Sequence, residues 1–181
     1  MSASLPESIS FEPLRDHDRT SFACGVPELD QYLRTQARQD AKRRVAAPFV
    51  LVSGEEILGY YTLSAYGIRI GDIPQGLQKK LPKYPLLPAT LLGRLAVSEA
   101  HRGRKLGRLL LMDALYRSCK NTREIASIGV VAEALNEGAR AFYLHHEFVP
   151  LRDHPNRLFL AMDTIAKALG ERLLKLDAGN D

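Results

Sequence analysis

A chain of 181 residues, 45% of them hydrophobic, can bury one full core, and we expect a single domain over residues 1–181. Its formal net charge of +4 is only moderately basic, so the position of the basic residues matters more than their total. Residues 1–11 lack the charged start and apolar core of a signal peptide, and no run reaches the ~18 apolar residues of a membrane-spanning helix. These features exclude a membrane protein and predict a cytoplasmic one.

The spacing of apolar residues predicts a mixture of strands and helices along the chain. In chain order it predicts a strand at residues 9–14, a helix at 26–44, a hairpin of strands 49–52 and 57–66, a strand at 91–97, a helix at 106–121, a strand at 128–132, a helix at 137–145, a strand at 158–162 and a helix at 164–176. Because a hairpin is antiparallel, this order indicates a three-layer α/β/α fold around a central mixed, partly antiparallel sheet.

The predicted helix at 26–44 carries a row of basic residues. Pro27 suits its first turn, and Asp30 complements the positive end of the helix dipole. Arg34, Arg38 and Lys42 recur every fourth residue and therefore share one face. Such a row is either a solvated helix face or a surface that binds phosphates, and the sequence leaves both interpretations open.

A further basic cluster lies in the Pro-rich connection at residues 74–88. It consists of Lys79, Lys80 and Lys83. The same two interpretations apply to it.

Residues 92–111, LGRLAVSEAHRGRKLGRLLL, predict a buried strand, a basic loop with glycines and an amphipathic helix in direct succession. Leu95 to Val97 is a short apolar run typical of a central strand. A helix that begins near Leu106 directs unpaired backbone N–H groups and the positive end of its dipole toward the loop. Such a loop attracts a pyrophosphate, although a solvated turn that merely joins strand to helix has the same composition.

Other common catalytic patterns find no support. Cys24 and Cys119 lie far apart and match no metal or redox spacing, so we expect both to be free. His145 and His146 are adjacent, and adjacent side chains on a helix point about 100° apart, so no metal site is predicted. No nucleophile elbow of the form GxSxG occurs.

The basic loop resembles the acetyl-CoA-binding motif of the GNAT superfamily of N-acetyltransferases, whose pattern after a strand is Gln/Arg-x-x-Gly-x-Gly/Ala. Arg102 and Gly107 match the two ends of this pattern. Lys105 stands at the first family glycine, and Gly103 supplies a flexible position two residues earlier. The resemblance implies that the cofactor is acetyl-CoA. The cofactor-binding residues that it implies are Leu95, Ala96, Val97, Arg102, Gly103, Arg104, Lys105, Leu106, Gly107, Arg108 and Asn136.

Residues 131–148, VAEALNEGARAFYLHHEF, are similar to a second GNAT pattern, a strand, an Asn and a helix ending in Ala-x-x-Phe-Tyr before Gly-Phe. The resemblance implies that Asn136 holds the pantetheine arm and that Tyr143 is the catalytic general acid. A phenol of pKa ~10 is able to protonate a thiolate whose conjugate acid has a pKa near ~8.5. Glu147 stands where the family usually has glycine.

Three further segments resemble the acetyltransferase toxins of bacterial toxin–antitoxin modules. They are FACGVPELDQYL at residues 22–33, LGYYTLSAYGI at 58–68 and LGRLAV at 92–97, and the resemblance extends over residues 11–163. It implies an enzyme that acetylates the α-amine of aminoacyl-tRNA and blocks translation. The implied substrate-binding residues are Arg34, Arg38, Lys42 and Arg94. The implied partners are aminoacyl-tRNA and a ribbon-helix-helix antitoxin, and a homodimer is expected.

The choice of amine follows from its protonation. At pH 7 an α-amine of pKa ~7.7 is roughly one-sixth neutral, whereas a lysine amine of pKa ~10.4 is neutral in about one molecule in 2,500. An α-amine therefore needs little help from a base, and the candidate bases in the sequence are the carboxylates Glu99 and Glu133. Two alternatives stay open: a GNAT enzyme that acetylates a small-molecule, peptide or protein amine, and a non-catalytic nucleic-acid-binding module. Arg94 has a structural alternative as well, an ion pair.

Overall fold

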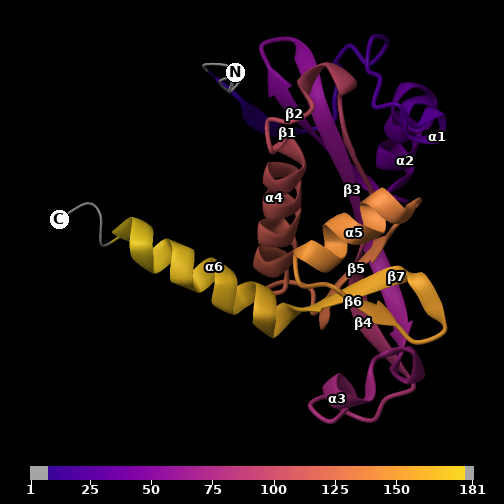
Figure 1. Ribbon diagram of the computed structural model, residues 1–181, viewed down its shortest axis with the longest axis vertical. Helices are drawn as coiled ribbons and strands as arrows, with labels where there is room; N and C mark the ends of the chain where they lie inside the picture. Colours follow the sequence, from indigo (N-terminus) through magenta and orange to yellow (C-terminus); the bar gives the residue numbers. More distant parts are fainter. Residues whose placement is uncertain (1–7, 178–181) are drawn as a thin grey trace. The chain divides into compact units, whose positions relative to one another are not determined.

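The computed structural model describes residues 8–177 of the chain (Figure 1). Its elements in order are β1 (Ser10–Pro13), α1 (Pro27–Gln31), a π-helical turn (Tyr32–Gln36), α2 (Ala37–Arg43), β2 (Ala47–Ser53), β3 (Glu56–Arg69), a 3-10 turn (Ile70–Asp72), α3 (Gln75–Gln78), β4 (Leu86–Val97), a 3-10 turn (Glu99–His101), α4 (Leu106–Asn121), β5 (Gly129–Glu133), α5 (Glu137–His145), β6 (Val149–Leu151), β7 (His154–Ala161) and α6 (Met162–Asp177).

The strands form a seven-stranded sheet in the order β1-β2-β3-β4-β5-β7-β6. β2 and β3 are the predicted hairpin, with Phe49 opposite Tyr61 in antiparallel register. β7 pairs antiparallel with both β5 and β6. The predicted mixed α/β fold with a partly antiparallel sheet is thus confirmed.

The chain divides into two compact units. The first comprises Met1–Ser64 and Leu92–Ala114, and the second comprises Ala65–Leu91 and Leu115–Asp181. β3 and β4 each run from one unit into the other along the chain. The expectation of a single domain stays a prediction.

Aromatic rings dominate the core of the first unit. Tyr60 is fully buried, packs edge-on against Phe22 and lies in a stack with Tyr32. Its hydroxyl donates a 2.7 Å hydrogen bond to the Leu29 carbonyl, so the buried oxygen is satisfied. Leu33 and the helix residues around it complete this cluster, which holds the helical segment against the β2–β3 hairpin.

The predicted helix at 26–44 forms, but it contains a wide turn. The Ala37 N–H donates to the Tyr32 carbonyl, five residues back, so one extra residue is accommodated at Tyr32–Gln36. Such turns are rare and are found most often as single insertions in α-helices near functional sites. The apolar periodicity of the sequence gives no sign of this turn, because buried Leu29, Leu33 and Ala37 still follow the spacing of a regular helix.

The core of the second unit lies where β5 pairs with β7. Val131 stands opposite Phe159, and both are buried. Gly129 at the start of β5 has no room for a side chain, because a Cβ there would lie 2.4 Å from the Phe159 ring and 2.5 Å from the Leu160 carbonyl. Ile73 and Leu87 close the other side of this cluster.

Two strand assignments from the sequence need correction. β4 begins at Leu86, five residues before the predicted start. Pro88 has no backbone N–H to donate, but its carbonyl accepts the Ile128 N–H at 2.9 Å, and this bond extends the strand. β6 (Val149–Leu151) was not predicted, since three residues around Pro150 show no period-two pattern. The other predicted elements are present, with boundaries that differ by a few residues.

Candidate functional site

The predicted cofactor loop joins the 3-10 turn at Glu99–His101 to α4. Gly103 and Lys105 both have left-handed backbone, with φ of 78° and 58°. α4 begins at Leu106, so the N–H groups of its first turn have no acceptor within the helix. Nothing lies within 4 Å of a Cβ built on Gly103, which leaves open space beside the loop. The loop therefore has the dipole, the donors and the room that a pyrophosphate requires.

The arginines and lysine of the loop fall into two groups. Lys105 and Arg108 are exposed, and no hydrogen bond or ion pair is assigned to either side chain within residues 8–177. Arg102 donates a 2.7 Å hydrogen bond to the Cys24 carbonyl and lies 3.6 Å from a Glu99 oxygen. Lys105 and Arg108 are thus free to meet an anion, whereas Arg102 connects the loop to the segment before α1.

Arg104 is also engaged within the protein. It is half-buried and lies 3.2 Å from His101 Nδ1, while His101 Nε2 lies 2.7 Å from a Glu56 oxygen. This chain of contacts fixes the start of the loop to the end of the β2–β3 hairpin.

Both departures from the GNAT patterns fall at left-handed residues. Lys105 has φ of 58° and Glu147 has φ of 71°. A side chain in this region costs about 1–2 kcal/mol, which glycine avoids. The chain therefore keeps the backbone shape that a glycine would serve and carries the strain at two positions. The loop thus adopts a left-handed backbone at this position although Lys105 stands in place of glycine.

The strand that leads into the loop is held by close packing within the first unit. Ala96 is buried and Leu95 and Val97 are half-buried. A Cβ on Gly59 would lie 2.8 Å from the Ala96 carbonyl and 2.7 Å from a Leu110 methyl carbon, so β3, β4 and α4 meet at this point. The absence of a side chain at Gly59 lets α4 approach the sheet and sets where its N-terminus lies.

The basic face of the helical segment is exposed, but two of its three members have partners. The Arg34 guanidinium donates to the Phe22 carbonyl, and Arg38 forms a 2.5 Å ion pair with Asp16. Lys42 is exposed without an assigned hydrogen bond among the described residues. The prediction that these three side chains share an accessible face is compatible with the structure, but their role in binding is not tested by it.

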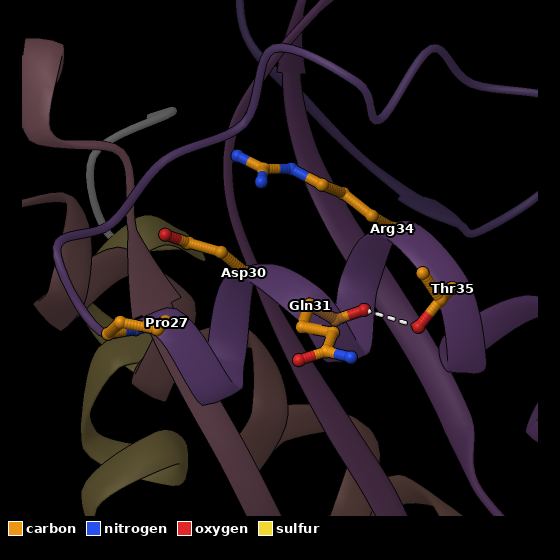
Figure 2. Close-up of a pocket in the computed structure, with 5 residues that line it drawn as sticks. All are labelled: Pro27, Asp30, Gln31, Arg34 and Thr35. Carbon is orange, nitrogen blue, oxygen red and sulfur yellow. Dashed lines mark hydrogen bonds between the residues drawn. The ribbon is translucent and has the colours of Figure 1, made fainter.

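A pocket of about 430 Å³ opens beside the wide turn. Its lining residues are Pro27, Asp30, Gln31, Arg34 and Thr35. Figure 2 shows the side chains of Asp30 and Arg34 extending from the helix in the same general direction. Asp30 is buried and accepts the Cys24 N–H at 2.8 Å. Sequence reasoning included Arg34 here and missed the others, because a pocket beside a wide turn leaves no periodic signal.

Arg94 has an aromatic partner. Its guanidinium carbon lies 3.5 Å from the centre of the Tyr32 ring, so the two make a cation–π contact, which neither of the two interpretations of Arg94 included. The Tyr32 hydroxyl donates to Asp40 at 2.9 Å. Burial first and the Asp40 bond second raise the pKa of Tyr32 to about 12, although the positive charge of Arg94 acts in the opposite direction.

Tyr143 lies on α5 in the second unit and is only 3% exposed. Its ring packs against Phe142 and Phe148, with centroids 5.4 Å and 5.3 Å away. Within residues 8–177 no hydrogen bond is assigned to the Tyr143 hydroxyl. Burial of the ring raises the pKa of Tyr143 above its ordinary value, and the hydroxyl is fully protonated at pH 7.

Asn136 is the N-cap of α5. Its side-chain oxygen accepts the Ala139 N–H at 2.8 Å, and the residue is exposed. The amide nitrogen remains the atom with which it would contact a ligand. The structure thus places Asn136 and Tyr143 on one short helix of the second unit, and the cofactor loop, Arg34 and Arg94 in the first.

The histidine pair and the cysteines show no reactive arrangement. The rings of His145 and His146 are nearly perpendicular, at 86°, and His146 Nδ1 bonds to the Phe142 carbonyl at 2.8 Å. Across residues 8–177 no three His, Cys, Asp or Glu side chains are grouped as metal ligands. Cys24 and Cys119 are both free. None of the helices in the described residues has the length and apolar character that a bilayer crossing requires.

Comparison with known proteins finds the same family over most of the chain. The Acetyltransferase (GNAT) domain model matches residues 46–150. The tRNA-acetylating toxin of Mycobacterium tuberculosis (strain ATCC 25618 / H37Rv) is 33% identical over 154 residues, which cover 85% of this chain and 92% of the relative.

Two solved structures of AtaT are similar to this fold. AtaT complexed with acetyl-methionyl-tRNAfMet has a TM-score of 0.84 at 28% identity, over 90% of this chain and 99% of that chain. A tyrosine-to-phenylalanine mutant of the AtaT toxin, bound to the C-terminus of the antitoxin AtaR and acetyl-CoA, has a TM-score of 0.77 at 26% identity, over 89% of this chain and 98% of that chain.

Proposed function

Because the chain belongs to the GNAT family of acetyltransferases, we propose that it transfers an acetyl group from acetyl-CoA to the α-amine of an aminoacyl-tRNA and thereby acts as a toxin that blocks translation. The observation that carries this proposal is the likeness, over nine-tenths of the chain, to a toxin solved with acetyl-methionyl-tRNAfMet. The similarity to a tRNA-acetylating toxin, which extends beyond the GNAT match on both sides, supports the same substrate class.

The loop that precedes α4 would hold acetyl-CoA. Lys105 and Arg108 offer exposed positive charge, and the first turn of α4 offers backbone donors. The main chain of Leu95 to Val97 would extend along the pantetheine arm, with the amide nitrogen of Asn136 as a further donor. Acetyl-CoA, when bound, supplies an activated acetyl group and a leaving thiolate that needs a proton.

Tyr143 is the proposed source of that proton. Its buried ring is held by Phe142 and Phe148, and because burial raises its pKa, its hydroxyl carries its proton at pH 7. Its raised pKa makes the phenol a weaker acid than free tyrosine. The leaving thiolate must therefore lie within hydrogen-bond distance of the hydroxyl to receive the proton, which water then replaces.

The carboxylates support an amine that needs no strong base. Glu99 lies 3.6 Å from Arg102, and Glu133 lies 3.2 Å from Arg157. Each of the two candidate bases therefore has a carboxylate oxygen turned to a guanidinium and not to a substrate amine. An α-amine of pKa ~7.7, partly neutral at pH 7, suits such a site better than a lysine amine.

For the RNA we propose Arg34, Arg38, Lys42 and Arg94 as contacts. The first three are exposed along one helical segment, and backbone neutralisation dominates nucleic-acid affinity. Arg94 is fixed over the Tyr32 ring beside this segment, so its guanidinium is oriented before any ligand arrives. We further propose a cytoplasmic location, a homodimer, and a ribbon-helix-helix antitoxin as partner, in line with the antitoxin-bound AtaT relative.

The test is transfer of labelled acetyl from acetyl-CoA to charged tRNA, compared with uncharged tRNA and with free amino acids. We expect label only on charged tRNA, at the amino acid. Tyr143→Phe is the matched control, since it keeps the ring and removes the proposed proton donor. Label on free amines alone would move the protein to the alternative of a small-molecule acetyltransferase. No transfer with any acceptor, by protein that binds acetyl-CoA, would refute the proposed reaction.

A further inference from the structure

The second unit carries a basic loop that the proposed site does not use. From Ile73 to Ser98 the chain contains no acidic residue. Lys79, Lys80 and Lys83 all lie in this stretch, between α3 and β4, and all three side chains are exposed. The positive charge of the loop is therefore not compensated by acidic neighbours in sequence.

The backbone of this loop is held in place from inside. Ile73 is fully buried, and Leu77 and Leu81 pack against the same core cluster. The Gln78 side chain donates to the Ile73 carbonyl at 2.6 Å, and the Ile70 N–H donates to the Pro85 carbonyl at 3.2 Å. Because the apolar side chains point inward, the lysines between them are displayed on a restrained backbone.

A large aromatic side chain stands among these cations. Tyr84 is 64% exposed and lies between Lys83 and Pro85. Within residues 8–177 no hydrogen bond or ring contact is assigned to Tyr84. Leu86, two residues on, is 59% exposed, and its methyl carbons lie 3.2 Å from where a Cβ on Gly67 would be. An exposed aromatic ring thus belongs to the same short stretch of chain as three exposed lysines.

We propose that this lysine–tyrosine loop, residues 79–86, binds the RNA part of the substrate. The three lysines contact backbone phosphates, and the Tyr84 ring stacks on an unpaired base. The inference rests on the proposed function, since it names a surface by which an aminoacyl-tRNA is held. An acidic protein segment would satisfy the lysines, but it would leave the exposed ring without the flat partner that a base provides.

The experiment measures tRNA binding by filter retention across a salt series, with both uncharged and charged tRNA. Replacing Lys79, Lys80 and Lys83 together by alanine should reduce the slope of log affinity against log salt by about 2–3, since each phosphate contact contributes about 0.7–0.9. Tyr84→Ala should weaken binding about 5- to 150-fold at one salt concentration with little change of slope. Tyr84→Phe keeps the ring and should bind like wild type.

Matched controls come from the same unit. Tyr116→Ala removes a tyrosine that is 45% exposed on α4, and Lys167→Ala removes an exposed lysine on α6. Both should leave affinity and slope unchanged. Melting curves check that the variants are folded.

The outcomes separate the loop from the reaction. If wild type acetylates charged tRNA but Tyr84→Ala and the lysine variant keep wild-type affinity and slope, the loop inference is overturned and the proposed function stands. If wild type binds tRNA through the loop but transfers no acetyl group, the proposed reaction fails while the binding surface remains. The inference is also overturned if the loop variants lose only their binding to an acidic protein partner and keep their affinity for RNA. A wild-type protein that binds no tRNA overturns it as well.

Discussion

Replacing Lys105 by glycine should stabilise the protein, although glycine destabilises the interior of a helix. Lys105 has φ of 58°, which costs a side chain about 1–2 kcal/mol. Glycine removes that cost but adds about 0.5–1 kcal/mol of conformational entropy to the unfolded chain. The expected net gain in the free energy of unfolding is about 0.5–1 kcal/mol, or a rise in Tm of about 1–4 °C at this chain length. Acetyl-CoA binding should be retained, because the backbone shape is unchanged.

Chemical and thermal unfolding of four variants tests the argument. Arg108→Gly places glycine three residues further on, inside α4, where it should cost about 0.5–1 kcal/mol. Gly103→Ala places a side chain at φ of 78°, and since nothing lies within 4 Å, any loss reports backbone strain alone. If Lys105→Gly lowers stability as much as Arg108→Gly does, the strain argument is wrong. Glu147→Gly, at φ of 71°, should repeat the gain of Lys105→Gly.

Four further outcomes are expected. Tyr143→Phe should slow acetyl transfer by about 10²- to 10⁴-fold with acetyl-CoA affinity retained, as kinetics and a binding isotherm will show. Because burial raises the pKa of Tyr143, the unfolded chain loses its phenolic proton first as pH rises above ~10, so wild-type stability should fall there by about 1.4 kcal/mol per pH unit relative to Tyr143→Phe. Gly107→Asp should weaken acetyl-CoA binding, measured by a thermal-shift titration, because it places negative charge against phosphate. Arg34→Glu with Arg38→Glu should weaken tRNA binding and flatten its salt dependence while acetyl-CoA binding persists.

The predictions for Tyr143→Phe and for the double arginine change have internal checks. Asp16→Asn frees Arg38 from its ion pair without removing the cation, so tRNA affinity should hold or rise. A fully active Tyr143→Phe enzyme would remove Tyr143 as the acid without touching the family assignment. Unchanged affinity and salt slope after the double arginine change would leave those residues as a solvated face.

The sequence predicts the family and most of the fold because two GNAT motifs, the basic loop and residues 131–148, each lie between a strand and a helix with clear apolar periodicity. The GNAT match at residues 46–150 and the helices at α4 and α5 agree with the pattern-based predictions. What sequence reasoning missed is set by contacts distant in the chain. β4 starts early because the carbonyl of Pro88 meets the Ile128 N–H, and no local pattern records that bond.

The candidate site shows the same division. The sequence identifies the basic residues, but it does not say which of them are engaged within the protein. Arg102 bonds to the Cys24 carbonyl and Arg104 lies against His101, whereas Lys105 and Arg108 are exposed. The sequence shows which residues are positively charged. Whether such a side chain is free to bind a ligand depends on which acceptors the fold places within hydrogen-bond distance of it. The roles of these residues and of Tyr143 stay predictions.

The wide turn at Tyr32–Gln36 should allow the chain to lose one residue without a change of fold. A π-helical turn takes up one residue more than an α-helical turn, so deleting one residue there leaves a regular helix whose flanking faces keep their direction. The same deletion in a regular helix would rotate everything beyond it by about 100°. Buried Leu29 before the turn and Ala37 after it would therefore keep their places in the core. The segment that carries the basic face is therefore one in which the deletion of a single residue should leave the fold unchanged.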